Sequence, residues 1–180
     1  MNKKIYKLVL AAVFCALVFT LTWISFPAPS IGNVNVGDCM VILCGCVLGG
    51  PYAVAAAALG AALCDLASGY AIYAPGTLVI KALMVLVILL MRKFVFKKDN
   101  LLSVIIPGAC AEVMMIVGYF IYESLILGYG FGAIANAPFN AIQGVIGLVV
   151  ATLLFSVLKK AGILRMVAEN KNRCSENGYK

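Results

Sequence analysis

The sequence predicts an all-α integral membrane protein with six transmembrane helices and both termini in the cytoplasm. Of 180 residues, 64% are hydrophobic and 12% are charged, whereas a soluble domain is about 45–50% apolar and about 25% charged. The mean hydropathy is +1.06. Apolar runs of membrane-span length alternate with loops rich in Gly, Pro and Asn, and the basic residues gather in three places.

Six apolar segments follow one another along the chain: 5–25, 38–49, 52–66, 77–91, 101–127 and 139–158. Turn-forming residues bound them, most clearly in the loops 26–37, 67–76 and 128–138. Between the second and third segments lies GGP, whose Pro51 suits the first turn of a helix. These two segments are short for a span at about 1.5 Å per residue, so we expect them to be tilted, extended into the loops or shielded by neighbours. We divide the chain into one six-helix membrane domain, 1–160, and a polar cytoplasmic tail, 161–180.

The basic residues predict the orientation. All but one of the fourteen Lys and Arg lie at the N-terminus, in 92–98 or from Lys159 onward, and the exception is Lys81. The loops 26–37, 67–76 and 128–138 contain none. Positive charge marks the cytoplasmic side of a membrane protein, so the N-terminus, the 92–98 loop and the C-terminal region are expected inside.

Several classes of function are disfavoured by what the sequence lacks. The net charge of +7 belongs to membrane-flanking residues, and no nucleic-acid module accompanies it. There is no histidine and no CxxC pair among the seven cysteines, so we expect no metal site and no cofactor, and each cysteine is expected to be a small buried hydrophobe. No nucleotide-binding or hydrolase motif is present, so we expect neither an enzyme nor an ATPase.

Ionisable and amide side chains within the apolar segments are the candidate functional residues, because such groups are costly in lipid. Glu112, Met115, Tyr119 and Glu123 recur at helical spacing and form one stripe. Amides stack similarly on the last segment, and both stripes are expected to face one cavity open to the outside. The sequence favours a binding cup for a small polar-aromatic molecule. The expected ligand-binding residues are Glu112, Tyr119, Glu123, Asn136, Asn140, Gln143, Lys81, Tyr73, Asp65 and Asp38.

Other interpretations of these residues stay open. Asp65 and Lys81 are equally consistent with a structural pair that neutralises two charges across the 67–76 loop. The aromatic residues Trp23, Tyr70 and Tyr73 are also typical of a membrane-interface belt. Amides on the last segment are consistent with hydrogen bonds that join helices. Small residues at every fourth position in the first three segments favour close helix packing, either internally or against a partner protein.

The central motif resembles one family. Asn35, Gly37 and Asp38 are followed by LGGP, then by DLASGYAIYAPGT from Asp65 and by Ile80-Lys81. This run is similar to the substrate-binding S components of energy-coupling factor (ECF) vitamin transporters, except that the family pattern has LGP at the glycine-proline step. The resemblance covers about residues 5–160.

The resemblance implies a mechanism and partners. S components have six helices with both termini cytoplasmic, bind a vitamin or precursor from outside, and associate with a membrane T component and two ATPase subunits. They are thought to topple in the membrane and so carry the ligand inward. Ala12 and Ala16 match the family's AxxxA motif that contacts the T component. A multi-pass protein of the bacterial cell membrane is therefore expected.

The resemblance also bears on the ligand. The branch includes members assigned to riboflavin, hydroxymethylpyrimidine and pyridoxine, and riboflavin carriers have F-S-D where this chain has Val36-Gly37-Asp38. We expect a small pyridoxine- or hydroxymethylpyrimidine-like ring, with Glu112 as hydrogen-bond acceptor and Tyr119 stacked on the ring. The alternatives are riboflavin, a structural or assembly membrane protein without a ligand, and a stand-alone carrier driven by protons through Glu112.

Overall fold

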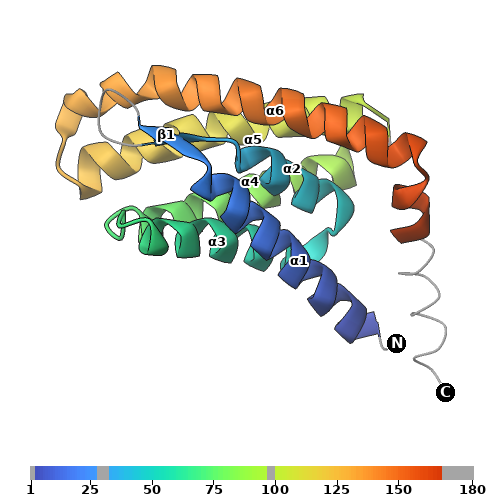
Figure 1. Cartoon of the computed structure of the whole chain (residues 1–180). Coiled ribbons are helices and arrows are strands. Elements are labelled where there is room, and N and C mark those ends of the chain that lie inside the picture. The colour runs from blue at the N-terminus through green and yellow to red at the C-terminus, as the bar shows by residue number, and fades with distance from the viewer. Residues whose placement is uncertain (1–2, 28–32, 97–99, 168–180) are drawn as a thin grey trace.

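The computed structural model describes residues 3–27, 33–96 and 100–167, and its described part is a bundle of six α-helices (Figure 1). The helices are α1 (Lys3–Trp23), α2 (Asp38–Val47), α3 (Gly50–Ala67), α4 (Ala74–Phe94), α5 (Leu102–Ile121) and α6 (Ala137–Lys160). The remaining elements are β1 (Ser25–Pro27), β2 (Asn33–Asn35), the π-helix η1 (Tyr122–Ile126) and the 3₁₀-helix η2 (Gly130–Asn136). Most of the predicted tail, including Cys174, lies outside the described residues.

Helix length separates five spans from one short helix. Among the described residues, five helical segments are long and apolar enough to cross a membrane: 4–23, 50–67, 74–94, 102–126 and 130–160. By contrast α2 has 10 residues, a rise of about 15 Å. Neighbouring helices shield α2, as predicted, because it packs against α1, α3, α4 and α6 and seven of its residues are buried.

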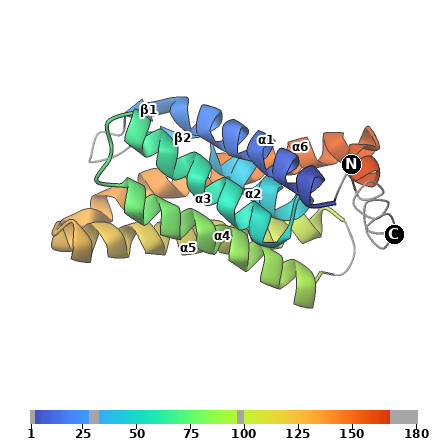
Figure 2. The ribbon, with the colours of Figure 1, turned by 90° about the horizontal axis from the view of Figure 1, so that it is seen from below.

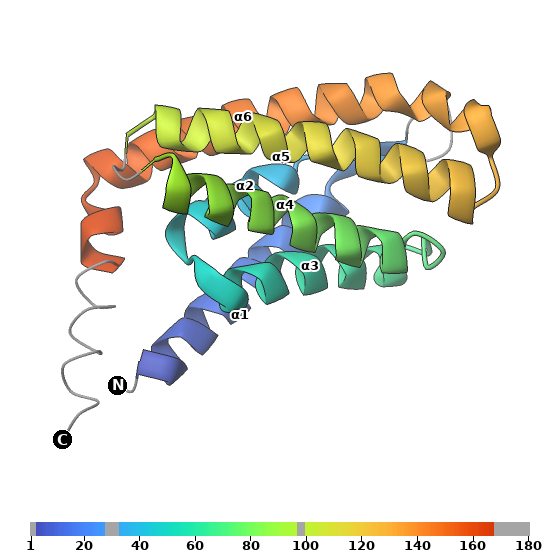
Figure 3. The same cartoon turned by 180° about the vertical axis from the view of Figure 1, so that it is seen from behind.

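The helices pack in an order that differs from their order in the chain. Figure 2 shows α1 beside α3, and α4 beside α5. Viewed from behind, α5 lies along α6, while α3 lies along α4 (Figure 3). The start of α1 and the ends of α4 and α6 lie at one end of the bundle, which therefore gathers the described basic residues other than Lys81. The two-stranded hairpin and the 68–73 loop lie at the opposite end.

Small residues have different surroundings on different helices. Ala53, Ala57 and Ala61 of α3 are fully buried. A Cβ at Gly60 would lie 2.5 Å from the carbonyl oxygen of Cys15, so α1 and α3 approach with their backbones nearly in contact. The internal-packing interpretation is therefore correct for α3. In α1, by contrast, Ala12 and Ala16 are exposed.

The helix boundaries differ from the predicted ones where local chemistry extends or interrupts a helix. The fourth helix begins at Ala74 rather than at 77, because Pro75 fits its first turn. The predicted 101–127 helix changes at Tyr122 into a π-helix, and the predicted 128–138 loop contains the 3₁₀-helix η2. The 26–37 loop holds the β1–β2 hairpin, in which Phe26 pairs with Val34. Pro51 lies in the first turn of α3, as predicted.

The cysteines occupy both interior and surface positions. Cys39, Cys44 and Cys64 are buried, whereas Cys15 and Cys46 are partly exposed. The expectation that every cysteine is buried is wrong for Cys110, which is exposed on α5. A surface thiol in an apolar span is consistent with contact with lipid, where a small weakly polar side chain is tolerated.

Candidate ligand-binding site

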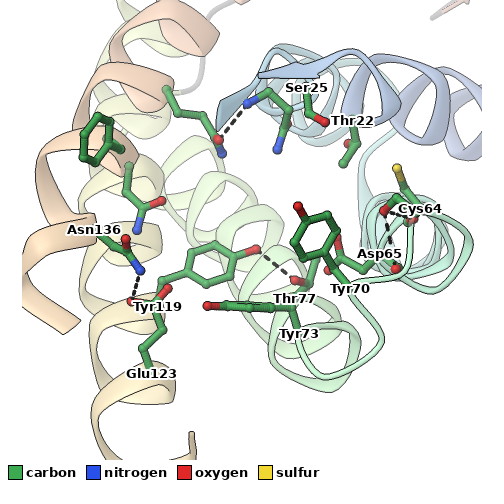
Figure 4. Close-up of a pocket in the computed structure, with 15 residues that line it drawn as sticks. Thr22, Ser25, Cys64, Asp65, Tyr70, Tyr73, Thr77, Tyr119, Glu123 and Asn136 are labelled. Carbon is green, nitrogen blue, oxygen red and sulfur yellow. Dashed lines mark hydrogen bonds between the residues drawn. The ribbon is translucent and has the colours of Figure 1, made fainter. Parts of the chain in front are cut away.

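A pocket lies at the end of the bundle that holds the β1–β2 hairpin and the 68–73 loop. Figure 4 shows its lining residues. Its empty space, including the open mouth, is about 670 Å³. Every helix and strand of the described part except α2 supplies at least one lining residue. The lining residues are Thr22, Ser25, Asn35, Cys64, Asp65, Ser68, Tyr70, Tyr73, Thr77, Tyr119, Glu123, Asn136, Phe139, Asn140 and Gln143.

Aromatic side chains form much of the pocket wall. Tyr119 of α5 lies across from Thr77 of α4, and their hydroxyls share a hydrogen bond of 3.0 Å. Tyr73 comes from the loop before α4, where burial, and after it the Glu123 carboxylate, raises the pKa of its phenol. The Tyr73 hydroxyl is therefore neutral near pH 7 and able to donate a hydrogen bond. Together with Tyr70 and Phe139, these rings offer π-faces to a planar ligand.

Glu123 is placed by the π-helix that follows α5. Asn136 of η2 donates a hydrogen bond of 2.9 Å to its Oε2 atom, and both side chains are buried. π-helical turns occur frequently at functional sites, because they rotate the residues that follow them. The neighbouring Tyr122 donates a 2.7 Å hydrogen bond to the carbonyl of Ile72. This bond attaches the 68–73 loop to the π-helix η1, which also carries Glu123.

Asp65 supplies a second carboxylate on the opposite side. Its Oδ2 atom is buried and has no hydrogen-bond partner among the described residues. The interpretation of Asp65 and Lys81 as a pair is wrong, because the Lys81 ammonium forms its ion pair with Asp38. Asp65 therefore keeps an acceptor free at the pocket wall.

The ion pair lies beneath the pocket, where three helices meet. Lys81 of α4 contacts Asp38 Oδ1 of α2, and Gln143 of α6 donates a 2.6 Å hydrogen bond to Asp38 Oδ2. The Gln143 carbonyl accepts a 3.0 Å hydrogen bond from the backbone N–H of Asn35. Lys81 also lies 5.7 Å from the centre of the Tyr119 ring, a cation–π distance. Gln143, Asn35 and Tyr119 line the pocket, so the pair supports the pocket floor through them.

Glu112 lies beside this pair and does not line the pocket. Its side chain is 5% exposed, and neither carboxyl oxygen has a hydrogen-bond partner among the described residues. It packs against glycines of α6: a Cβ at Gly144 would lie 3.0 Å from Glu112 Oε2. The predicted stripe of Glu112, Met115, Tyr119 and Glu123 does face inward, but only its last two members reach the pocket.

The ten expected site residues therefore separate into two sets. Seven line the pocket, and these are Asp65, Tyr73, Tyr119, Glu123, Asn136, Asn140 and Gln143. Three lie beneath it: Asp38, Lys81 and Glu112. Phe139 was missed, although it falls at the spacing Asn136, Phe139, Asn140, Gln143 that marks one helix face. Thr22 and Ser25 could not be identified as lining residues from the sequence. No sequence pattern shows which side of α1, or of the strand that follows it, faces the cavity.

Three comparisons with known proteins identify the family of this chain. Residues 2–160 match the family described as "ECF-type riboflavin transporter, S component". The chain is 33% identical over 166 residues to the thiamine precursor transporter HmpT of Lactococcus lactis subsp. cremoris, which covers 91% of this chain and 93% of that protein. Its fold is similar to the solved S component of a bacterial ECF transporter, with a TM-score of 0.72 and 21% identity, covering 87% of this chain and 97% of the other. The chain belongs to the S-component family of ECF-type transporters, whose members are membrane transport proteins.

Proposed function

We propose that this S component binds a small aromatic vitamin precursor whose ring carries hydrogen-bond donors, such as an aminopyrimidine or a hydroxymethyl-substituted pyridine. The observation that carries the proposal is the composition of the pocket. Aromatic faces stand beside two carboxylates and several amides, and no Lys or Arg is among the described lining residues.

The polar groups of the pocket favour a ligand that donates hydrogen bonds, and they disfavour a ligand that carries negative charge. Glu123 and Asp65 lie on different elements and provide acceptors on two sides of the pocket. Asn140 and Gln143 add amide groups that both donate and accept. A ring with an exocyclic amino group at one position and a hydroxymethyl group at another matches this arrangement. The relative named as a thiamine precursor transporter supports the same class of ligand.

Riboflavin is the second candidate, because the matched family is described by it. Its tricyclic ring has carbonyl acceptors along one edge, which need donors from the protein. Here the described lining offers amides and hydroxyls as donors but no cation. Lys81, the one buried lysine among the described residues, is engaged by Asp38 beneath the pocket. The pocket therefore suits the smaller, donor-bearing ring better.

We also propose the orientation and the partners of the chain. Both termini and the α4–α5 connection face the cytoplasm, because the described basic residues other than Lys81 gather at that end of the bundle. All six helices then lie in the bilayer of a bacterial cell membrane, with α2 enclosed by its neighbours. Ala12 and Ala16 form an exposed small-residue face of α1 suited to a membrane T component. ATP hydrolysis would come from two ATPase subunits bound to that component.

The test is ligand binding by the purified chain in detergent, without a T component or ATPase. Thermal unfolding would be followed with hydroxymethylpyrimidine, pyridoxine, riboflavin and thiamine. A ligand at a hundred times its Kd adds about 2.7 kcal/mol to stability, so the correct ligand raises Tm clearly. Stabilisation by riboflavin alone would favour the second candidate, and no stabilisation by any compound would contradict the proposal.

Uptake experiments address the two other interpretations. The family assignment already favours transport over a purely structural role. Uptake that survives loss of the ATPases but collapses with an uncoupler would favour a stand-alone, proton-driven carrier. Uptake that requires the ATPases supports the S-component assignment.

A further inference from the structure

Two acids and one base are buried together beneath the pocket. The acids are Asp38 and Glu112, with 0% and 5% of their surfaces exposed, and the base is Lys81, with 3% exposed. A Cβ at Gly147 of α6 would lie 2.9 Å from Asp38 Cβ and 3.4 Å from Glu112 Oε1. Both acidic side chains therefore pack against Gly147, and their carboxyl groups are close enough to interact electrostatically.

Lys81 balances only one of the two acids. Its ammonium pairs with Asp38, and Gln143 completes the contacts of the other Asp38 oxygen. Glu112 is left with two buried oxygens and no donor among the described residues. The ionisable groups that face it are Asp38 and Cys39 of α2 and Lys81 of α4, while the contacting positions on α6 are the glycines 144 and 147. None of these supplies a second positive charge.

A carboxylate without a donor is expensive inside an apolar bundle, whereas a carboxylic acid is much less so. Since burial of a net charge is the dominant cost, the lowest free energy belongs to the arrangement in which the three groups sum to zero. That arrangement is Asp38 negative, Lys81 positive and Glu112 neutral.

We propose that Glu112 is a proton-binding site, and that its carboxyl carries a proton while Lys81 is paired with Asp38. The two acids then compete for one lysine. When Lys81 leaves Asp38 for Glu112, the proton passes from the Glu112 carboxyl to the Asp38 carboxylate, so that the three buried groups still sum to zero. Gln143 donates a hydrogen bond to Asp38 and also lines the pocket. A change in the position of the proton is therefore coupled to the position of the Gln143 side chain in the pocket floor.

The proton can be observed on the full-length chain without ligand, so failure of this proposal is distinct from failure of the ligand assignment. The chain has four glutamates: Glu112, Glu123, Glu169 and Glu176. Labelling glutamate with ¹³C at the side-chain carboxyl gives four NMR signals, whose shifts distinguish the acid from the carboxylate. At neutral pH an ordinary glutamate is ionised. We expect three signals at the carboxylate position and the Glu112 signal at the acid position.

Assignment does not depend on one variant. Glu112→Gln removes the Glu112 signal directly. If that variant does not fold, Glu123→Gln, Glu169→Gln and Glu176→Gln assign the other three signals and identify Glu112 by elimination. Four carboxylate signals at neutral pH would overturn the proposal.

Asp38→Asn tests the competition for Lys81. The asparagine keeps the shape of Asp38 but removes its charge, so Lys81 becomes available to Glu112. We expect the Glu112 signal to move to the carboxylate position at neutral pH. The matched control is Asp65→Asn. It removes an acid that makes no hydrogen bond or ion pair with Lys81 or Glu112 among the described residues, and it is expected to leave the Glu112 signal at the acid position. A Glu112 signal that stays protonated in Asp38→Asn would overturn the link to Lys81.

Discussion

Lys81 forms an ion pair with Asp38, which lies 43 positions earlier in the chain and on a different helix. The side chains are 3% and 0% exposed, so the contact is sealed from solvent and lipid by the packed helices. The pair joins α2 to α4, and Gln143 extends it to α6. Three helices that are separated in sequence thus meet at one polar point in an otherwise apolar interior.

Lys81→Met is expected to destabilise the protein strongly. Removing one partner of a buried ion pair costs about 3–5 kcal/mol, because the remaining charge is left uncompensated. Thermal unfolding in detergent measures the effect, with the exposed Lys93→Met as control. Adding Asp38→Asn to Lys81→Met is expected to recover part of the loss. Equal Tm values for Lys81→Met and Lys93→Met would show that the pair contributes little.

Glu123→Gln is expected to weaken binding of the ligand identified in the thermal screen. A hydrogen bond to a charged group contributes about 1.5–3 kcal/mol, which corresponds to roughly a 10–100-fold increase in Kd. Isothermal titration calorimetry would measure it. The same substitution at Glu112 distinguishes contact from support, because Glu112 lies beneath the pocket. A loss at Glu112 as large as that at Glu123 would return Glu112 to the residues that touch the ligand.

Gly76→Ala is expected to loosen the 68–73 loop. A Cβ there would lie 2.7 Å from the Tyr122 ring, which must then shift and weaken its hydrogen bond to the Ile72 carbonyl. Overpacking of this kind costs about 1–3 kcal/mol. Hydrogen exchange of the loop should rise and Tm should fall. The control is Gly132→Ala, whose added Cβ meets no atom within 4 Å. Matching exchange rates in the two variants would contradict the expectation.

Ala12→Trp and Ala16→Trp are expected to abolish uptake while leaving ligand binding intact. Both alanines are exposed on α1, and a large ring there prevents close approach of a partner helix. Co-purification with the T component and whole-cell uptake would be measured beside ligand binding. Val149→Trp, an exposed position on α6, is the control. Normal uptake with a tryptophan at both alanine positions would exclude this face as the interface.

The apolar runs and turn residues were sufficient to predict six helices, because lipid imposes a strong and local pattern on a sequence. Boundaries were less predictable where a helix continued in another form, as at Tyr122 and in the 3₁₀-helix before Ala137. Both changes depend on packing between loops that are distant in sequence. A local pattern contains no information about that packing.

The sequence predicted which types of residue form the candidate site. It did not predict which of them line the pocket and which lie beneath it. Helical spacing correctly placed Tyr119 and Glu123 on one inward face with Glu112. It could not show that the pocket ends above Glu112, since this depends on how Asp38 and Lys81 fill the space below. Proximity in sequence favoured Asp65 as the partner of Lys81, yet the fold brings α2 to α4 instead.

The shortness of α2 has a consequence for how the protein enters the membrane. A helix of 10 residues cannot hold itself across a bilayer, and a lone lysine in α4 opposes insertion of that helix. The two helices stabilise one another, because Asp38 of α2 neutralises Lys81 of α4 and α4 packs over α2. We therefore expect stable insertion of α2 only after α4 has been synthesised, and a ribosome-bound chain ending before residue 81 is expected to leave α2 accessible to water-soluble reagents.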